Sequence, residues 1–256
     1  MGKETVVLVP GLFMGGISMA VLQRRLCECG FDARRFSYYS ARLSPAQNAV
    51  RLNDFLWTVQ SPVAHFVCHS LGGLVVRHLF SRFPDQRSGR VVTLGTPHRG
   101  SYVAARLARI LPFRLLLGAS LKEGLLGEVP PWQDNRALAV IAGTRSLGAG
   151  ELISDLPKPN DGTVAVIETE LPGMHAHVQL PVTHTGLLVS PIVARYVCEY
   201  LKTGAFPDNP KEGEGDDAIG GTGAIRFAGT GHRGAAGASA GDPQHDRDPS
   251  APALRR

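Results

Sequence analysis

Short apolar runs alternate with amphipathic stretches along the first 200 residues of the chain. The runs have the length and residue types of buried strands, and the apolar positions between them recur at helical spacing. Strands are predicted at residues 5–9, 31–39, 63–67, 90–94, 138–142 and 162–167, and helices at residues 18–29, 45–57, 74–80 and 190–201. Ser18 is the predicted N-cap of the first helix. This alternation predicts an α/β fold, a doubly wound and mostly parallel sheet with helices on both faces.

Two regions depart from the alternation. In residues 101–134, Val103, Leu107, Ile110 and Leu111 share one helical face, and prolines interrupt the segment. We expect either a short helical cap (a lid) whose apolar face lines an acyl pocket, or an ordinary amphipathic helix packed on the sheet. From residue 207 the chain is rich in glycine and proline and poor in large apolar residues, which is typical of disordered segments. The predicted organisation is one domain over residues 1–206 and a disordered tail over residues 207–256.

Composition narrows the class of protein. A hydrophobic content of 43% and a charged content of 19% are ordinary for a soluble globular protein. No apolar run approaches the roughly 20 residues that span a bilayer. The amino terminus leads directly into the first predicted strand rather than into a signal peptide, so a cytoplasmic location is predicted. The net charge of +5 is mild and no nucleic-acid-binding motif accompanies it, so we expect no nucleic-acid partner.

The four cysteines show no metal-ligand or redox-motif spacing. Cys27 and Cys29 lie on a predicted helix, Cys68 lies near a predicted turn, and Cys198 lies in the last helix. Each is predicted to be a small apolar packing residue.

A predicted strand runs into a predicted helix at Cys68-His69-Ser70-Leu71-Gly72. A sharp strand-to-helix turn at a serine forces a strained backbone and exposes the hydroxyl at the positive end of the helix. Gly72 and Gly73 would let the helix approach the sheet closely. Ser70 is therefore a candidate nucleophile, and the alternative is a buried connection with an incidental serine.

An activated serine needs a general base and an acid that orients the base. Asp161 lies in the turn-rich stretch 160–164, and His184 lies just ahead of the last helix. Both positions suit loops at the carboxyl ends of strands. His175 and His177 are the rival bases, and as a His-x-His pair they could also bind a metal, although no further ligand is evident. Asp155 and Asp134 are the rival acids.

A glycine-rich loop follows the first predicted strand and begins at Pro10-Gly11-Leu12. Such a loop leaves backbone N–H groups unpaired. The amides of Leu12 and Leu71 are therefore the candidate oxyanion hole, and loss of one such donor typically costs about 3 kcal/mol of transition-state stabilisation.

Taken together, these motifs resemble the lipase and esterase branch of the α/β-hydrolase superfamily. The chain is similar to bacterial triacylglycerol lipases and to lipase-like hydrolases that include inositol deacylases and palmitoyl-protein thioesterases. The matching segments are residues 8–12, 69–73, 94–101, 160–164 and 183–184, in the order Ser70, Asp161, His184. Two positions depart from the pattern: Pro10 stands where many relatives have histidine, and Cys68 replaces the first glycine of the elbow.

The resemblance implies a serine hydrolase that cleaves carboxylic esters with an apolar acyl group, without a metal or other cofactor. His69 and His98 match family motifs and are expected to hold the elbow and a neighbouring loop. The implied partner is a small acyl ester or lipid, with transient contact to a lipid interface through the cap. Two alternatives stay open: a thioesterase or acyltransferase that uses the same site, and a catalytically silent fold that binds a lipid or a protein.

Overall fold

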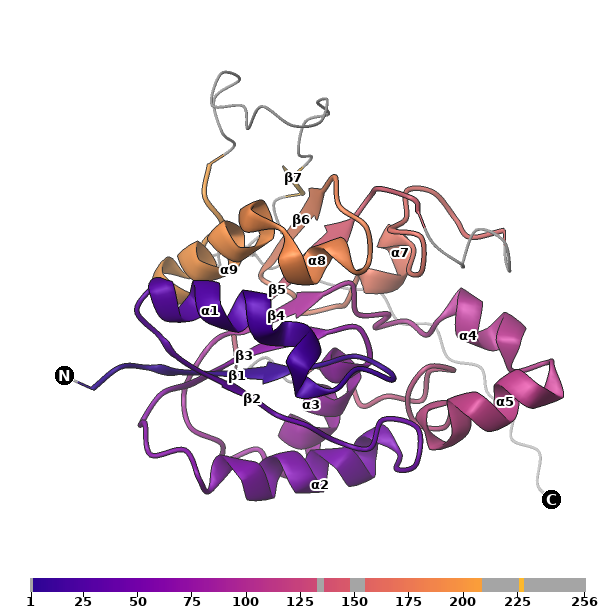
Figure 1. The fold of residues 1–256 in the computed structure, drawn as a ribbon, viewed down its shortest axis with the longest axis horizontal. Helices are drawn as coiled ribbons and strands as arrows, with labels where there is room; N and C mark the ends of the chain where they lie inside the picture. Colours follow the sequence, from indigo (N-terminus) through magenta and orange to yellow (C-terminus); the bar gives the residue numbers. More distant parts are fainter. Residues whose placement is uncertain (1, 133–135, 148–154, 209–225, 228–256) are drawn as a thin grey trace, which may run out of the picture.

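The computed structural model describes residues 2–132, 136–147, 155–208 and 226–227 (Figure 1). One sheet forms its centre, in the strand order β2-β1-β3-β4-β5-β6-β7. The strands are β1 (Thr5–Val9), β2 (Asp32–Arg35), β3 (Ala64–His69), β4 (Val91–Leu94), β5 (Leu138–Gly143), β6 (Ala176–Leu180) and β7 (Arg226–Phe227). The first six strands are parallel, and β7 pairs with β6 in the antiparallel direction. The predicted mostly parallel α/β sheet is confirmed.

Helices cover both faces of the sheet and bury one apolar cluster on each (Figure 1). On one face lie α1 (Ala20–Glu28), α8 (Gly186–Val189) and α9 (Pro191–Thr203), with the 3₁₀ helix η1 (Gly16–Met19) ahead of α1. On the other face lie α2 (Pro45–Leu56) and α3 (Leu71–Arg82). The central strands β1, β3, β4 and β5 are buried along their whole length, which explains why they appear as continuous apolar runs.

Two local predictions were wrong. Residues 162–167 do not form a strand, because Gly162 has a φ of 89° and the Thr163 and Val164 N–H groups donate to the Asp161 carboxylate. They form a turn that leads into the short helix α7 (Val166–Thr169), and the strand of this region is β6. Ser18 does not cap α1, because its hydroxyl donates to the Gly15 carbonyl within η1.

The segment that breaks the alternation folds as two short helices, α4 (Tyr102–Leu107) and α5 (Leu111–Leu117), followed by the 3₁₀ helix η2 (Gly118–Ser120). These helices lie beyond the carboxyl ends of the strands (Figure 1). Because α4 ends at Leu107, the single apolar face predicted for this segment divides: Val103 is buried, whereas Ile110 and Leu111 are exposed. Apart from Pro207, Asp208 and β7, the predicted disordered tail lies outside the described residues.

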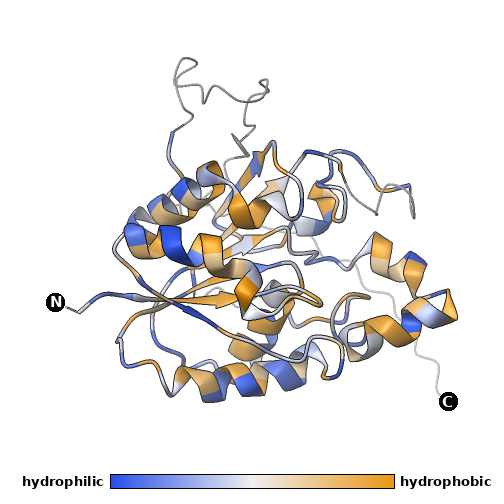
Figure 2. Ribbon diagram, viewed as in Figure 1, coloured by the Kyte–Doolittle hydropathy of each residue, from blue (hydrophilic) through white to orange (hydrophobic). Residues whose placement is uncertain are grey.

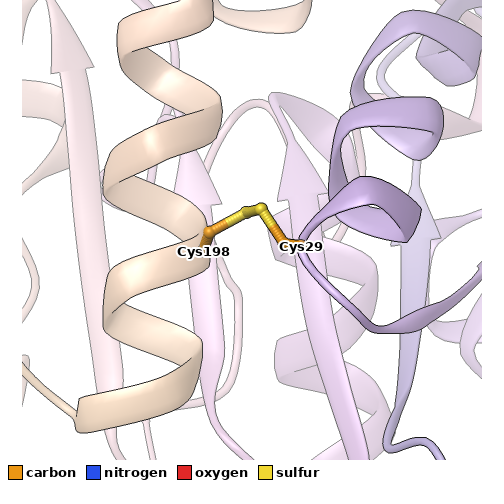
Figure 3. The surroundings of a disulfide bond; sticks show 2 residues. All are labelled: Cys29 and Cys198. Carbon is orange, nitrogen blue, oxygen red and sulfur yellow. A yellow bond between two sulfur atoms is a disulfide. The ribbon is translucent and has the colours of Figure 1, made fainter.

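A disulfide joins Cys29, at the end of α1, to Cys198 in α9 (Figure 3). The prediction that every cysteine is a simple packing residue was therefore wrong for this pair. The two cysteines are 169 positions apart, and the parallel packing of α1 and α9 on one face of the sheet brings their Cα atoms to 6.3 Å. Cys27 is free and exposed, and Cys68 is free and buried. Within the described residues no helix is long and apolar enough to span a bilayer.

Candidate active site

Ser70 occupies the sharp turn between β3 and α3, with a φ of 50° and a ψ of −122°. A non-glycine residue in such a conformation is strained, and the surrounding hydrogen bonds hold it there. The Ser70 N–H donates to the Leu94 carbonyl, and the Ser70 carbonyl accepts from Gly73 N–H and from the Thr96 hydroxyl. These bonds leave the side chain free to face the cavity beside the turn.

Close packing of α3 on the sheet explains the small residue at position 72. A β-carbon on Gly72 would lie 2.3 Å from the Val9 carbonyl oxygen, so any larger residue would push α3 away from β1. The cysteine at position 68 meets no such conflict, because its side chain is buried in the apolar cluster under α2 and α3. Burial raises the pKa of the Cys68 thiol, so this cysteine stays protonated and is no rival nucleophile.

Asp161 and His184 form a hydrogen-bonded pair, with Oδ2 of the aspartate 2.7 Å from Nδ1 of the histidine. The other carboxylate oxygen, Oδ1, accepts from Thr163 N–H at 2.9 Å and Val164 N–H at 2.7 Å. The His184 N–H donates to the Asp161 carbonyl, which adds a backbone bond to the pair. Asp161 is 1% exposed, so its charge is sheltered from water and directed at the imidazole.

This geometry fixes which imidazole nitrogen is available for chemistry. With its proton on Nδ1 donated to Asp161, the neutral ring presents an unprotonated Nε2. The ring lines the cavity that Ser70 also lines. The three side chains selected from the sequence, Ser70, Asp161 and His184, thus lie together at the carboxyl ends of the parallel strands.

The rival residues lie elsewhere. The Nδ1 of His175 accepts from the N–H of Leu138, the first residue of β5. His175 therefore lies at the amino ends of the strands, away from Ser70. His177 lies within β6 and contacts the Thr169 hydroxyl. Asp155 shares a surface hollow with α4, and Asp134 lies outside the described residues. No cluster of three metal-ligating side chains occurs in the described part of the chain.

His69 and His98 hold backbone segments, as expected. His69 Nε2 donates to the His184 carbonyl at 3.0 Å, and the two rings lie 4.6 Å apart. Burial lowers the pKa of His69 far below its usual value, so it stays neutral beside the site. His98 contacts the Thr93 hydroxyl, and its carbonyl accepts from Arg77.

A mostly apolar cavity of about 260 Å³ opens in front of these residues. Val103, Ala104 and Leu107 from α4 and Leu117 from α5 contribute to its wall, so the cap segment lines the pocket as one of the two sequence interpretations expected. Leu12 and Phe13 border the cavity from the loop after β1.

The two candidate oxyanion donors lie beside Ser70. Leu71 is the first residue of α3, where the N–H has no partner within the helix. In the loop after β1, the N–H groups of Phe13 and Met14 are engaged, by Ser40 Oγ and by the Gly11 carbonyl. The Leu12 amide has no such bond among the described residues.

The sequence interpretation assigned no role to two residues around this pair. Gly95, with a φ of 56°, packs so closely that a β-carbon there would lie 3.0 Å from Asp161 Oδ2 and 3.1 Å from His184 Nδ1. Glu168 is 2% exposed and accepts from the N–H groups of Ala165 and Tyr102, so it connects the loop after Asp161 to the start of α4. Burial, reinforced by the nearby charge of Asp161, raises the pKa of Glu168 to about 7. The positive φ of Gly95 and the tertiary contacts of Glu168 have no signature in the local sequence pattern.

Solved structures of several bacterial lipases and carboxylesterases share this arrangement of strands and helices. The mature lipase BlEst2 of Bacillus licheniformis superposes with a TM-score of 0.63 at 19% identity, over 78% of this chain and 91% of that one. A metagenomic carboxyl esterase gives 0.58 at 17% identity, over 79% and 76%. The carboxylesterase CesB of Bacillus subtilis gives 0.53 at 15% identity, over 80% and 85%.

The chain has the α/β-hydrolase fold. The sequence itself matches no family model and no curated protein, so the likeness lies in the three-dimensional structure. At such low identity the likeness shows the fold and leaves the chemistry to the residues of the site.

Proposed function

We propose that this α/β-hydrolase is a serine esterase that cleaves carboxylic esters of small acyl substrates. Ser70 is the nucleophile, His184 the general base and Asp161 the residue that orients the imidazole. The single observation that supports this assignment most strongly is the 2.7 Å Asp161–His184 bond beside a cavity that the strained Ser70 also lines.

In the proposed mechanism His184 Nε2 takes the Ser70 proton as Oγ attacks the ester carbonyl carbon. The negative charge that develops on the carbonyl oxygen is held by the N–H groups of Leu12 and Leu71. His184 then gives its proton to the departing alcohol, which leaves an acyl group on Ser70. A water molecule, deprotonated by the same imidazole, releases the acid and restores the hydroxyl. Asp161 stays ionised and stabilises the imidazolium in both steps.

The cavity is suited to an ester with an apolar acyl group, because Leu107, Leu117 and Leu125 form much of its wall. Thioester cleavage and acyl transfer to an alcohol would use the same residues. An added alcohol as competing acceptor separates hydrolysis from transfer, because a transferase would form the new ester at the expense of free acid.

Hydrolysis of p-nitrophenyl esters from acetate to palmitate tests the proposal. Ser70→Ala is expected to lose at least about 10⁴-fold in kcat and to lose covalent labelling by a fluorophosphonate. Ser81→Ala, an exposed serine of the same helix, is the matched control and should keep both. For the base, His184→Ala should be inactive, and His175→Ala should resemble the wild type. A folded wild type that neither labels nor hydrolyses any ester would refute the assignment and favour a silent binding fold.

We retain a cytoplasmic location as a prediction from the sequence. The Cys29–Cys198 disulfide argues against this location, because such bonds persist mainly in oxidising compartments. The redox state of this pair in cells would test the location directly.

A further inference from the structure

The segment that follows β2 lies against the loop that follows β1. Strand β2 is at the edge of the sheet, next to β1 and parallel to it, so the two segments leave the sheet at the same end. Figure 2 shows the hydrophilic β2 beside the hydrophobic β1. We call residues 10–16 the oxyanion loop, because they include the candidate donor Leu12, and we call residues 37–40 the brace.

Three hydrogen bonds join side chains of the brace to the backbone of the oxyanion loop. They are the bonds from Tyr38 Oη to the Pro10 carbonyl at 2.7 Å, from Phe13 N–H to Ser40 Oγ at 2.9 Å, and from Gly16 N–H to Ser37 Oγ at 3.1 Å. The brace thus supplies one donor and two acceptors to a loop that forms no strand or helix before residue 16.

Two of these bonds lie on either side of the Leu12 amide. The Leu12 N–H belongs to the peptide that begins at the Gly11 carbonyl. Tyr38 holds the peptide before it and Ser40 holds the peptide after it, while the Gly11 carbonyl accepts from Met14 N–H at 3.3 Å. Because a trans peptide is planar, with C=O and N–H on opposite sides, these bonds together set the direction of the Leu12 N–H.

The turn at this point is strained. Phe13 has a φ of 56° at the third position of the turn that the Met14–Gly11 bond closes. Turns with a positive φ at this position normally have glycine or asparagine there, because a β-carbon disfavours it. The bond from Phe13 N–H to Ser40 therefore holds a conformation that would otherwise relax, and relaxation would rotate the peptides beside Leu12.

The oxyanion loop has little space on its other side. A β-carbon on Gly11 would lie 3.0 Å from the Ser70 β-carbon and 3.0 Å from His69 Nδ1. The loop is thus confined between the elbow and the brace, and a small shift away from the elbow would move the Leu12 N–H relative to Ser70.

The brace is itself held in place. Ser40 is 7% exposed, and the Tyr38 ring stacks on Phe36 with a centroid separation of 5.6 Å. The fully buried Asn48 of α2 donates to the Tyr39 carbonyl. Burial raises the pKa of Tyr38, so its hydroxyl keeps the proton that it donates to the oxyanion loop.

We propose that Ser40 and Tyr38 are positioning residues that aim the Leu12 amide at the oxyanion of the transition state. Neither side chain touches the substrate; each acts through the backbone of the oxyanion loop. The inference rests on the proposed function, because it takes Leu12 as a donor to the negative charge that forms when Ser70 attacks.

Steady-state hydrolysis of p-nitrophenyl esters by Tyr38→Phe and Ser40→Ala is the first test. An oxyanion donor acts on the charge of the transition state, so the substitutions should lower kcat and leave KM nearly unchanged. We expect about a tenfold loss in kcat for each variant, and for the double variant at most the roughly 10³-fold loss that follows removal of one donor. Tyr38→Phe keeps the ring that stacks on Phe36, so only the hydroxyl is lost.

Inhibition separates misplacement of the donor from a general disturbance of the cavity. Octyl trifluoromethyl ketone adds the Ser70 hydroxyl to its carbonyl and places an oxyanion where the ester would. Its inhibition constant should rise by the same factor as kcat/KM falls in each variant. Octyl methyl ketone fills the same cavity largely without forming the adduct, and its inhibition constant should stay at the wild-type value.

Matched controls make the same changes beside the brace. Ser44→Ala also removes a serine oxygen that accepts from a backbone N–H, that of Gln47 at the start of α2. It should destabilise the protein but keep kcat, which separates stability from positioning. Tyr39→Phe changes the neighbouring exposed tyrosine, whose ring lies under Arg51, and should also keep kcat.

A glycine at position 13 tests the role of the strain. Glycine adopts a positive φ freely, so the turn would need the Ser40 bond less. Ser40→Ala should therefore lower kcat by a smaller factor in a Phe13→Gly background than in the wild type. Phe13 also lines the cavity, so the comparison is made between the two Phe13→Gly proteins.

Three results would overturn the proposal while the wild type hydrolyses esters. These are wild-type kcat in the Tyr38→Phe, Ser40→Ala double variant, losses equal to those of the Ser44→Ala and Tyr39→Phe controls, and equal weakening of the two ketones. A wild type that neither hydrolyses esters nor labels with a fluorophosphonate would instead refute the proposed function. Failure of the brace and failure of the proposed function are therefore distinguishable.

Discussion

Replacing Asp161 by asparagine changes one oxygen of the buried carboxylate to an amide nitrogen of nearly the same size. In the wild type, Oδ1 accepts from the Thr163 and Val164 N–H groups, and Oδ2 accepts from His184 Nδ1 at 2.7 Å. Only an oxygen can stay between two N–H donors. The asparagine is therefore expected to keep its oxygen at the Oδ1 position and to place its NH₂ against the imidazole.

That orientation selects the wrong tautomer of His184. The NH₂ group donates to Nδ1, so the ring proton moves to Nε2, the nitrogen that must accept the proton of Ser70. The opposite rotamer would place NH₂ against two N–H donors and lose both backbone hydrogen bonds. We expect kcat to fall about 10⁴-fold, which corresponds to about 5 kcal/mol of transition-state stabilisation.

The assay is p-nitrophenyl ester hydrolysis across pH, with circular dichroism and urea unfolding to show that the variant folds. Asp155→Asn, at the rival acid of the sequence, is the control and should keep wild-type kcat. A folded Asp161→Asn enzyme with kcat within tenfold of the wild type would show that this carboxylate does not set the tautomer of the base.

Three further predictions concern stability. Gly72→Ala should lower the free energy of unfolding in urea by about 2 kcal/mol, because the new β-carbon would lie 2.3 Å from the Val9 carbonyl. Reduction of Cys29–Cys198 should lower the free energy of unfolding by up to about 5 kcal/mol, since the bridge closes a loop of 169 positions. The free energy of unfolding should also fall as the pH rises from about 4 to about 7: the raised pKa of Glu168, about 7, means that the folded state holds a proton which the unfolded state has released. Glu168→Gln should remove this part of the fall.

Each stability prediction has its own check. Gly15→Ala is the control for Gly72→Ala, because a β-carbon at Gly15 would meet nothing within 4 Å. Equal decreases in the free energy of unfolding of the two variants would argue against the close approach of α3 to the sheet. An unfolding midpoint that reductant does not change would mean that the bridge contributes nothing. A Glu168→Gln protein with the same pH dependence as the wild type would assign that dependence to another group.

Much of the architecture was predictable because it depends on local patterns. Strands β1, β3, β4 and β5 are fully buried, so their sequences are apolar throughout and stand out from their surroundings. Strand β6 was missed because it lies beside the edge and includes His177 and Gln179, and the stretch 162–167 was wrongly predicted as a strand in its place. A turn held by backbone N–H groups that donate to the Asp161 carboxylate is not visible in residue hydropathy.

For the candidate site, the sequence by itself determined which residue types follow which strands. Ser70 could be selected because the strand before it and the glycines after it are adjacent in the chain, and Asp161 and His184 because they follow in the order typical of the fold. Only the tertiary structure decided that the Asp161–His184 bond forms, that Glu168 connects this loop to the cap, and that Cys29 meets Cys198. The physical reason is range: hydropathy and turn preferences act over a few neighbouring residues, whereas contacts across tens to hundreds of positions depend on how the sheet and its helices pack.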